Sequence, residues 1–468
     1  MRVILVFFAL IVLAVVGMTY WFGVEAEKTY KNIQEELSQY GNVEIIKRKY
    51  DRGWFSSDAE TELGIRVGAK KIASLILNDC ISHGPIPINK LLSGDFRLKP
   101  VQAIINSTIR TVPGTGNELT DFFAELPPPQ IKTTVDLKGN GESLISMPPF
   151  AHQDQEENGS INWEGVYGSA KFSPNFRQIT TDIKAPGLEL TSDEFKLSIK
   201  GIEFDFQLRS HVPDLYNPTG DMNLTIGNVN VENRKPQERY LIRQLKFYGG
   251  TELTGDNLVA TSTFAFENLN AGAKNYGPGY YEIIIRNIEP SAWAKLQKML
   301  RETQDTDTSN ETERNLLIGK IIDILPDLIK HSPEVELARL SLKTDGGEAS
   351  GRAKVTIDGS NPEIAKIPFL LLMSVKAEAG FTIPEALAES ILQNLARKNL
   401  LEKIEDAGDE VLEEDINESS KSAASKQVKK LIEQRILIPE GENLKLDASY
   451  ERGVFKLNGQ PMETPFSG

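Results

Sequence analysis

Cysteine and positive charge are scarce in this sequence. One of the 468 residues is a cysteine, Cys80, which excludes an intramolecular disulfide and a cluster of thiolate metal ligands. Acidic residues outnumber basic residues by 66 to 52, and the net charge of −14 argues against a nucleic-acid partner, because such a partner requires a basic surface. With 40% hydrophobic and 25% charged residues, the composition is typical of a water-soluble body and not of a multi-span membrane protein.

Compact catalytic and metal-binding motifs are also missing. The sequence contains no H-E-x-x-H spacing, no G-x-S-x-G nucleophile elbow and no phosphate-binding loop. Its four histidines lie far apart, and we predict no catalytic residue, no cofactor and no metal site. His83, beside Gly84 and Pro85, is the best single polar candidate. A turn histidine bonded to the backbone is nevertheless favoured over a catalytic one.

The longest uncharged hydrophobic run lies at the N-terminus. Val3–Phe22 would form a helix about 30 Å long, enough to cross a bilayer. The run is longer than that of a usual signal peptide and the V-E-A sequence at 24–26 is a poor cleavage site, so a retained signal anchor is favoured over cleavage. We predict a transmembrane helix at 1–22 and a polar stalk helix at 23–42. The positive-inside rule is nearly balanced and leaves the orientation open.

A six-residue motif, Y-[DE]-R-G-x-F, occurs near both ends of the chain. It reads Tyr50–Phe55 in one copy and Tyr450–Phe455 in the other, each at a break between runs of alternating hydrophobic and polar residues. Alternation on both sides of a glycine is typical of a β-hairpin, in which the glycine supplies a positive φ. We therefore predict hairpins with Gly53 and Gly453 in their turns. Arg52 and Arg452 could bind an anion, although stacking on tyrosine or pairing with an acid is favoured, and Trp54 and Phe55 are expected in the core.

Alternating runs continue through the middle of the sequence. They include Phe195–Leu208 and Leu258–Phe266, without helices between them, which favours antiparallel pairing. Helical spacing appears later, near 313–330, 384–404 and 421–434. The predicted fold class is α+β: antiparallel hairpins in a meander that forms a long curved sheet, a few packed helices, and one N-terminal transmembrane helix. After the stalk we predict a β-rich region at 43–290 and an α+β region at 291–468.

Several of these stretches resemble the YdgA-like family. Proteins of that family are Gram-negative, carry a domain of unknown function, and have one N-terminal span and a large periplasmic body. The resemblance implies an inner-membrane, single-pass protein with its body in the periplasm, and it implies no reaction. Besides G-V-E-A-E at 23–27, the residues that carry it are Tyr50, Arg52, Gly53, Trp54, Phe55, Ser56, Ser57, His83, Gly84, Pro85, Tyr450, Arg452, Gly453, Asn458 and Gly459.

Two functional hypotheses follow. The first is a binding or scaffold protein of the cell envelope whose curved sheet holds an apolar groove; its partners would be the membrane, through the N-terminal helix, and a lipid or a second copy of the chain. The second is an envelope enzyme that uses carboxylates in a polar cleft near His83. The lack of catalytic motifs favours a protein that is not an enzyme. An apolar surface would favour the first hypothesis and a polar cleft at His83 the second.

Overall fold

The chain folds into two compact units. The first unit comprises Met1–Thr225 and Ala294–Lys320, and the second unit comprises Ile226–Trp293 and Ile321–Gly468. Positions 1–15 of the predicted membrane span lie outside the residues that the structure describes. The computed structural model describes residues 16–32, 34, 43–67, 70–87, 94, 99–112, 127–153, 159–210, 219–234, 237–272, 274–302, 311–361, 363–364, 367–407 and 413–462.

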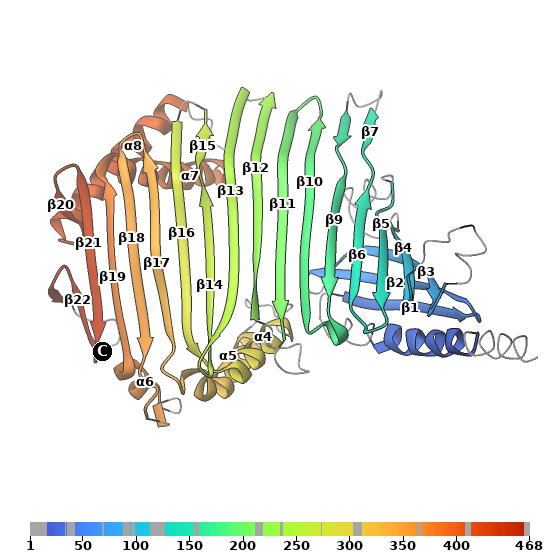
Figure 1. The fold of residues 1–468 in the computed structure, drawn as a ribbon. Helices are drawn as coiled ribbons and strands as arrows, with labels where there is room; N and C mark the ends of the chain where they lie inside the picture. The colour runs from blue at the N-terminus through green and yellow to red at the C-terminus, as the bar shows by residue number, and fades with distance from the viewer. Residues whose placement is uncertain are drawn as a thin grey trace, which may run out of the picture. The chain divides into compact units, whose positions relative to one another are not determined.

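The first unit is built on an antiparallel sheet (Figure 1). β1 to β6 pair in sequence order, after which β6 pairs with β9, β9 with β10, and β10 with β11. β8 pairs with Leu188–Thr191, the C-terminal part of β10, and β7 pairs with β8. The bounds are β1 Val43–Arg52, β2 Ser56–Val67, β3 Lys70–His83, β4 Val101–Thr111, β5 Gln130–Asp136, β6 Gly141–Met147, β7 Phe150–Gln153, β8 Ser160–Trp163, β9 Val166–Phe172, η1 Pro174–Phe176, β10 Gln178–Thr191 and β11 Phe195–Arg209.

The second unit has its own antiparallel meander. β13 pairs with β14 and β15, both of which pair with β16, and β16 to β19 then pair in order. β19 pairs with β21, which also pairs with β20 and β22, and β23 closes on β22. The bounds are β13 Gln237–Thr254, β14 Asn257–Phe266, β15 Asn268–Ala271, β16 Lys274–Ile288, β17 Glu334–Thr344, β18 Gly347–Ile357, β19 Val375–Pro384, β20 Ile438–Glu440, β21 Asn443–Glu451, β22 Val454–Leu457 and β23 Gln460–Met462; β12, Thr219–Arg234, contains the division between the units.

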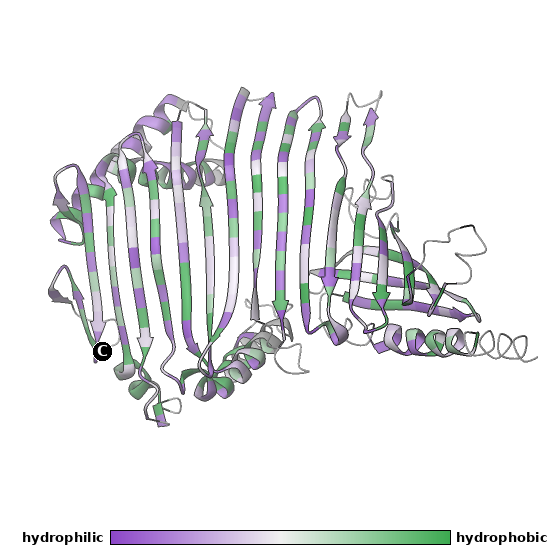
Figure 2. Ribbon diagram, viewed as in Figure 1, coloured by the Kyte–Doolittle hydropathy of each residue, from purple (hydrophilic) through white to green (hydrophobic). Residues whose placement is uncertain are grey.

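Hydrophobic and hydrophilic residues alternate along the strands of both units (Figure 2). In the first unit Ile183 pairs with Phe204, while the next pair along the ladder, Lys184 and Glu203, forms an ion pair of 3.6 Å. Because successive side chains point to opposite faces of a strand, one face of β10–β11 is apolar and the other is charged. The alternation in the sequence therefore determines the two faces directly.

Residues 16–32 and 34 are helical, and this N-terminal helix belongs to the first unit. The helix continues without a break across position 22, where the predicted span ends and the predicted stalk begins. Side chains of the helix contact β1, β2 and β3, as Tyr30 does with Tyr50 and Asp79. The helix thus lies on one face of the first three strands.

Helices in the later part of the chain lie at the two ends of the second unit's strands (Figure 1). α7 and α8 pack together, and their small core joins Ala388 and Val428 to Leu444 of β21. α6 joins β18 to β19 at the opposite end of these strands from α7 (Figure 1). The bounds are α6 Pro368–Ser374, α7 Glu385–Ala407 and α8 Glu413–Glu433; α4, Pro290–Glu302, and α5, Glu311–Ile329, each contain a division between the units.

The predicted fold class, α+β with a transmembrane helix, is wrong. Strands make up about 60% and helices about 25% of the structure, so the protein is mostly β. The meander dominates because alternating runs occupy most of the chain, whereas the apolar helical stripes are few. Within the described residues, none of the helices has both the length and the apolar character needed to cross a membrane.

Candidate functional site

The register of β2 and β3 places the polar residues of the first motif region on one face of the sheet. Ser57 pairs with Ile81, and Ala59 pairs with Asp79, so Ser57, Asp79 and His83 all project toward the N-terminal helix. All three are buried, and His83 is 0% exposed. We call Ser57, Thr61, Asp79 and His83, together with Tyr30 and Gln34 of the helix, the helix seat.

His83 is hydrogen-bonded through both ring nitrogens. Its Nδ1 lies 3.3 Å from the carbonyl oxygen of Trp54, and its Nε2 lies 2.8 Å from Ser57 Oγ. A carbonyl oxygen can only accept, so Nδ1 donates and Nε2 accepts the Ser57 hydroxyl proton. Burial lowers the pKa of His83 below its ordinary value, and nearby Arg52 acts in the same direction. Burial of His83 therefore favours its neutral imidazole form.

Close packing holds the helix against that ring. A Cβ atom built on Gly23 would lie 2.5 Å from His83 Cε1, and no real side chain tolerates such a contact. Glycine at position 23 lets the helix backbone approach the imidazole. With the helix in place, the His83 side chain is fully buried.

Asp79 is the buried carboxyl group of the helix seat. Tyr30 donates to Asp79 Oδ2 at 2.7 Å, and Gln34 donates to Thr61 Oγ1 at 2.6 Å. Desolvation raises the pKa of Asp79, although hydrogen bonds from Ser107 and Tyr30 oppose the rise. Burial and the Asp79 charge together raise the pKa of Tyr30. The buried carboxyl is thus satisfied by donors that include the N-terminal helix.

Arg52 attaches the first motif to the same helix. Its guanidinium lies 5.1 Å from the ring centroid of Tyr20 and 3.3 Å from a Glu27 carboxylate oxygen. It thus stacks on Tyr20, not on the neighbouring Tyr50 that the sequence suggested, and pairs with an acid, and both partners lie on the helix. Trp54, which was expected in the core, is 58% exposed and contacts Tyr20 at 5.1 Å. The reason is its place at the tip of the β1–β2 hairpin.

The two glycines of the motif copies play different parts. Gly453 has φ +80° and follows Arg452 at φ +51°, so the β21–β22 hairpin has the predicted left-handed turn. Gly53 does not have a positive φ, contrary to prediction. Its amide donates to Ser56 O at 2.8 Å, and a Cβ on Gly53 would lie 2.8 Å from that same oxygen. Close approach of the backbone therefore explains glycine there.

The second motif also holds a helix. Tyr450 donates its hydroxyl to the Leu372 carbonyl of α6 at 3.2 Å, and a Cβ on Gly453 would lie 3.1 Å from Met373 Sδ. Asn458 donates to the carbonyls of Arg435 and Ile436 at 2.8 and 3.1 Å. The first copy of the motif therefore holds the N-terminal helix in the first unit, and the second copy holds α6 in the second unit.

The remaining motif residues have structural places. Gly84 accepts no side chain, because a Cβ there would lie 1.7 Å from Val101 O, and its amide donates to Gln102 O at 2.7 Å. Gly459 has φ +78° in the β22–β23 turn. Ser56, Phe55 and Pro85 are half-buried.

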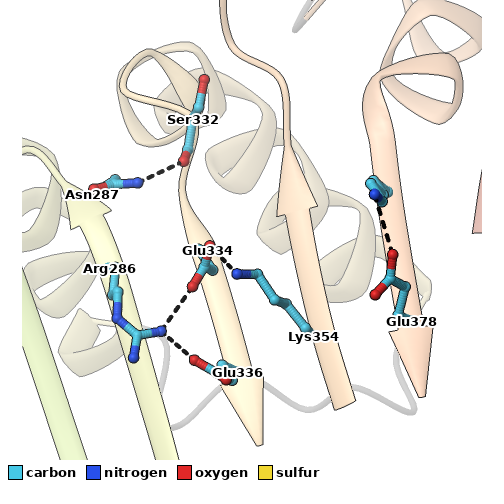
Figure 3. Close-up of polar contacts among 8 residues, drawn as sticks. Arg286, Asn287, Ser332, Glu334, Glu336, Lys354 and Glu378 are labelled. Atoms are coloured by element: carbon cyan, nitrogen blue, oxygen red, sulfur yellow. Dashed lines mark hydrogen bonds and ion pairs between the residues drawn. The ribbon is translucent and has the colours of Figure 1, made fainter. Parts of the chain in front are cut away.

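A charged cluster lies on one face of the second unit's sheet (Figure 3). Arg286 binds both Glu334, at 2.7 Å, and Glu336, while Lys354 binds Glu334 at 2.8 Å. The hydrogen bond from Lys354, with further help from Arg286, lowers the pKa of Glu334 below its ordinary value.

A cavity of about 470 Å³ adjoins this cluster and reaches α6. Its lining includes Lys376, Glu378, Glu451, Arg452 and Met373. Lys376 binds Glu378 at 3.1 Å, so charges in the cavity are partly paired already. No group of three or more His, Cys, Asp or Glu side chains within the described ranges could hold a metal ion.

These features define a class of protein: an antiparallel β-meander on which helices are held by buried polar contacts. The chain belongs to a family described as "Bacterial protein of unknown function (DUF945)", which matches residues 1–465. The match confirms a bacterial domain of unknown function over the whole chain, but not the name YdgA-like. No curated protein and no solved structure matches the chain.

Sequence reasoning missed the partners of the motif. Ser57 and His83 lie 26 positions apart, and the β2–β3 register that joins them depends on long-range pairing. Tyr30, Gln34 and Asp79 carried no motif at all. A usable indication was Gly23 itself, because glycine inside a helix normally costs about 1 kcal/mol relative to alanine and therefore suggests a close approach of the helix backbone to a neighbour.

Proposed function

We propose that this protein is a binding protein of the bacterial cell envelope that holds lipid acyl chains against the apolar face of its sheet. The observation that carries the proposal lies in the second unit. Val335 and Val355 are directly paired across β17 and β18, yet they are 44% and 40% exposed. Adjacent exposed valines on a long sheet are unusual on a soluble monomer and favour a bound apolar partner.

The surrounding residues make this surface a continuous stripe, which we call the apolar face. Strand pairing joins these residues into three rows across the sheet. Leu340 and Phe247, both in the first row, are also exposed. The rows are Phe247–Phe264–Tyr281–Leu340–Gly351–Phe381–Leu446, then Ile283–Leu337–Ala353–Ala379–Ala448, then Ile285–Val335–Val355–Ala377–Tyr450.

The charged cluster supports an acyl chain as the ligand. Its residues, such as Arg286 and Glu334, occupy the next positions along the same strands and therefore the opposite face. The apolar face carries no charge that would select a polar peptide. Each buried methylene contributes about 0.8 kcal/mol, so eight half-buried methylenes would contribute about 3 kcal/mol.

The first unit repeats the arrangement independently. Phe204 and Phe206 stack at 6.5 Å on one face of β11, where they pair with Ile183 and Thr181 of β10. These side chains are only half-buried. Two units with the same one-sided apolar sheet favour a binding role over catalysis, and the envelope location rests on the sequence resemblance described above.

Mass spectrometry of extracted ligands tests the proposal. The full chain, purified from cells, is expected to release phospholipid or fatty acid into organic solvent. The variant Val335→Asp/Val355→Asp should release severalfold less, because two carboxylates would have to be desolvated beneath the chain. Ser350→Asp, an exposed position on the charged face of β18, is the matched control and should release the wild-type amount.

Light scattering on the same samples separates a bound lipid from a bound second copy. A monomer or dimer that carries lipid supports the proposal. A lipid-free wild-type protein, whether monomer or stable dimer, contradicts it. Circular dichroism of the three proteins confirms that the variants retain their strands.

A further inference from the structure

Arg452, in the second copy of the motif, has an unfavourable backbone conformation. Its φ is +51°, and it precedes Gly453 in the β21–β22 turn. The left-handed conformation is unfavourable for a residue with a Cβ atom and is tolerated best by asparagine, so Asn-Gly is a preferred pair in such a turn. An arginine at this position indicates that the guanidinium has a role that an asparagine side chain could not fill.

The fold fixes this turn beside the cavity at α6. Tyr450 donates to the Leu372 carbonyl at 3.2 Å, and a Cβ on Gly453 would lie 3.1 Å from Met373 Sδ. Arg452 lies between these two contacts in sequence and lines the cavity of about 470 Å³. Small-molecule sites have volumes of about 300–1,000 Å³. Arg452 therefore lines a space that is large enough for a small ligand.

Both lysines that line the cavity are already paired with acids. Lys354 binds Glu334 at 2.8 Å, and Lys376 binds Glu378 at 3.1 Å (Figure 3). Among the residues that the structure describes, the Arg452 guanidinium has neither a hydrogen bond nor an ion pair. Arg452 is therefore the cation of the lining that is available to a ligand.

Two carboxylates of the lining lack a cation as well. Within the described ranges, Asp358 and Glu451 form no ion pair, although Glu451 lies opposite Lys376 in the strand register. Hydrogen bonds from Ser360 lower the pKa of Asp358, so this carboxyl group is ionised at neutral pH. The described part of the lining thus combines one unpaired cation with two unpaired anions.

The first copy of the motif shows which group such an arginine binds. Arg52 lies 3.3 Å from a carboxylate oxygen of Glu27. A guanidinium matches the planar geometry of a carboxylate, which it can bind through two parallel hydrogen bonds. A ligand with several negative charges would be repelled by Asp358 and Glu451, whereas an ammonium group on the same ligand would be attracted to them.

We propose that this cavity binds a small zwitterion, namely an amino acid or a short peptide. The ligand's carboxylate pairs with Arg452, and its ammonium group pairs with Asp358 or Glu451. The proposal goes beyond the binding of acyl chains, and neither proposal depends on the other. Because Arg452 and Glu451 are exposed, binding is expected to weaken as the salt concentration rises.

Titration of the full chain with alanine, dialanine and trialanine tests the proposal, because these probes place their two charges at increasing separation. Saturation-transfer NMR measures their binding, and at least one of the three should bind. The N-acetyl and the C-terminal amide forms of that probe each lack one charge and should bind severalfold more weakly.

The substitution Arg452→Asn should weaken binding of the same probe by about tenfold or more. In urea, without the probe, this variant should be at least as stable as the wild type, because asparagine suits the turn. The matched control is Arg435→Asn: Arg435 has φ +56°, belongs to the same unit and does not line the cavity, so binding should be unchanged.

A second variant tests the other end of the ligand. Asp358→Asn/Glu451→Gln should weaken binding of the unmodified probe severalfold and leave binding of its N-acetyl form unchanged. The proposal is overturned if none of the three probes binds the wild type, if the two blocked forms bind as tightly as the unmodified probe, or if Arg452→Asn binds like Arg435→Asn.

Discussion

At the scale of single residues, burial shifts the pKa values of Asp79 and His83, two of the ionisable groups in the helix seat, in opposite directions. The pKa of Asp79 is raised and the pKa of His83 is lowered, so both groups favour their neutral forms. A raised carboxyl pKa stabilises the docked helix fully below about pH 3.8, and this stabilisation is lost as the pH rises through the folded-state pKa. The lowered histidine pKa acts in reverse: its stabilisation is present above about pH 6.5 and is lost at lower pH.

We predict that Asp79→Asn removes the pH dependence of stability that comes from the Asp79 carboxyl group. The difference in stability between Asp79→Asn and the wild type should increase in favour of the variant as the pH rises from 4 to 7, because only the wild type must bury a charge. Hydrogen exchange of residues 16–32, compared at each pH, measures this difference. His83 is common to both proteins and cancels. A difference that stays constant or shrinks with rising pH would be inconsistent with a desolvated Asp79.

A second prediction concerns Gly453. Gly453→Ala should lower the free energy of unfolding by about 1–2 kcal/mol, because φ +80° places a Cβ against the following carbonyl. Gly346→Ala in the β17–β18 turn is the control: Gly346 has no positive φ and its nearest neighbour would lie at 3.7 Å. Urea denaturation of both variants gives the comparison. Equal stabilities would show that the left-handed turn is not required.

At the scale of secondary-structure elements, both motif copies hold a helix in place, a role that the motif sequence does not indicate. Arg52 holds the N-terminal helix, and Tyr450 holds α6. The repeated hairpins could be predicted because alternation and glycine are local signals. The attached helices could not, because their contacts join residues from 25 to 78 positions apart, as between Glu27 and Arg52 or Leu372 and Tyr450.

Gly23 provides the sharpest test of helix docking. Gly23→Ala should displace the helix, since the new methyl group would overlap the His83 ring, which two hydrogen bonds hold in place. Gly17→Ala is the matched control, with nothing within 4 Å of its Cβ. Both substitutions raise intrinsic helix propensity by about 1 kcal/mol. Faster hydrogen exchange of residues 16–32 is therefore expected in the first variant alone, and equal protection in both would refute the packing.

At the scale of the whole molecule, the sequence predicted the meander and misjudged the class. Alternation such as Phe195–Leu208 identified strands, and helical spacing near 384–404 matches α7. The transmembrane helix was inferred from hydropathy and from the family resemblance, neither of which indicates that Glu27 and Tyr30, in the predicted stalk, bind the sheet. The amount of uncovered apolar surface could not be read from sequence, because it depends on which faces the helices leave open.

Ligand binding should therefore stabilise the protein measurably. A monomeric phospholipid at a hundred times its Kd would add about 2.7 kcal/mol to the free energy of unfolding and raise the Tm by several degrees. Differential scanning fluorimetry measures the shift. The variant Val335→Asp/Val355→Asp should show little shift and Ser350→Asp the full one. A shift of equal size in all three proteins would indicate non-specific binding.

The pairing of strands with their neighbours in sequence has a consequence for how the protein is made. β1 to β6 in the first unit, and β16 to β19 in the second, each add to the strand that was synthesised just before. Several of these connections are short, whereas that between β16 and β17 contains α4 and α5, and the pairing of sequence neighbours keeps contact order low for an all-β architecture. Each unit can consequently assemble hairpin by hairpin as the chain emerges, before its last strand exists.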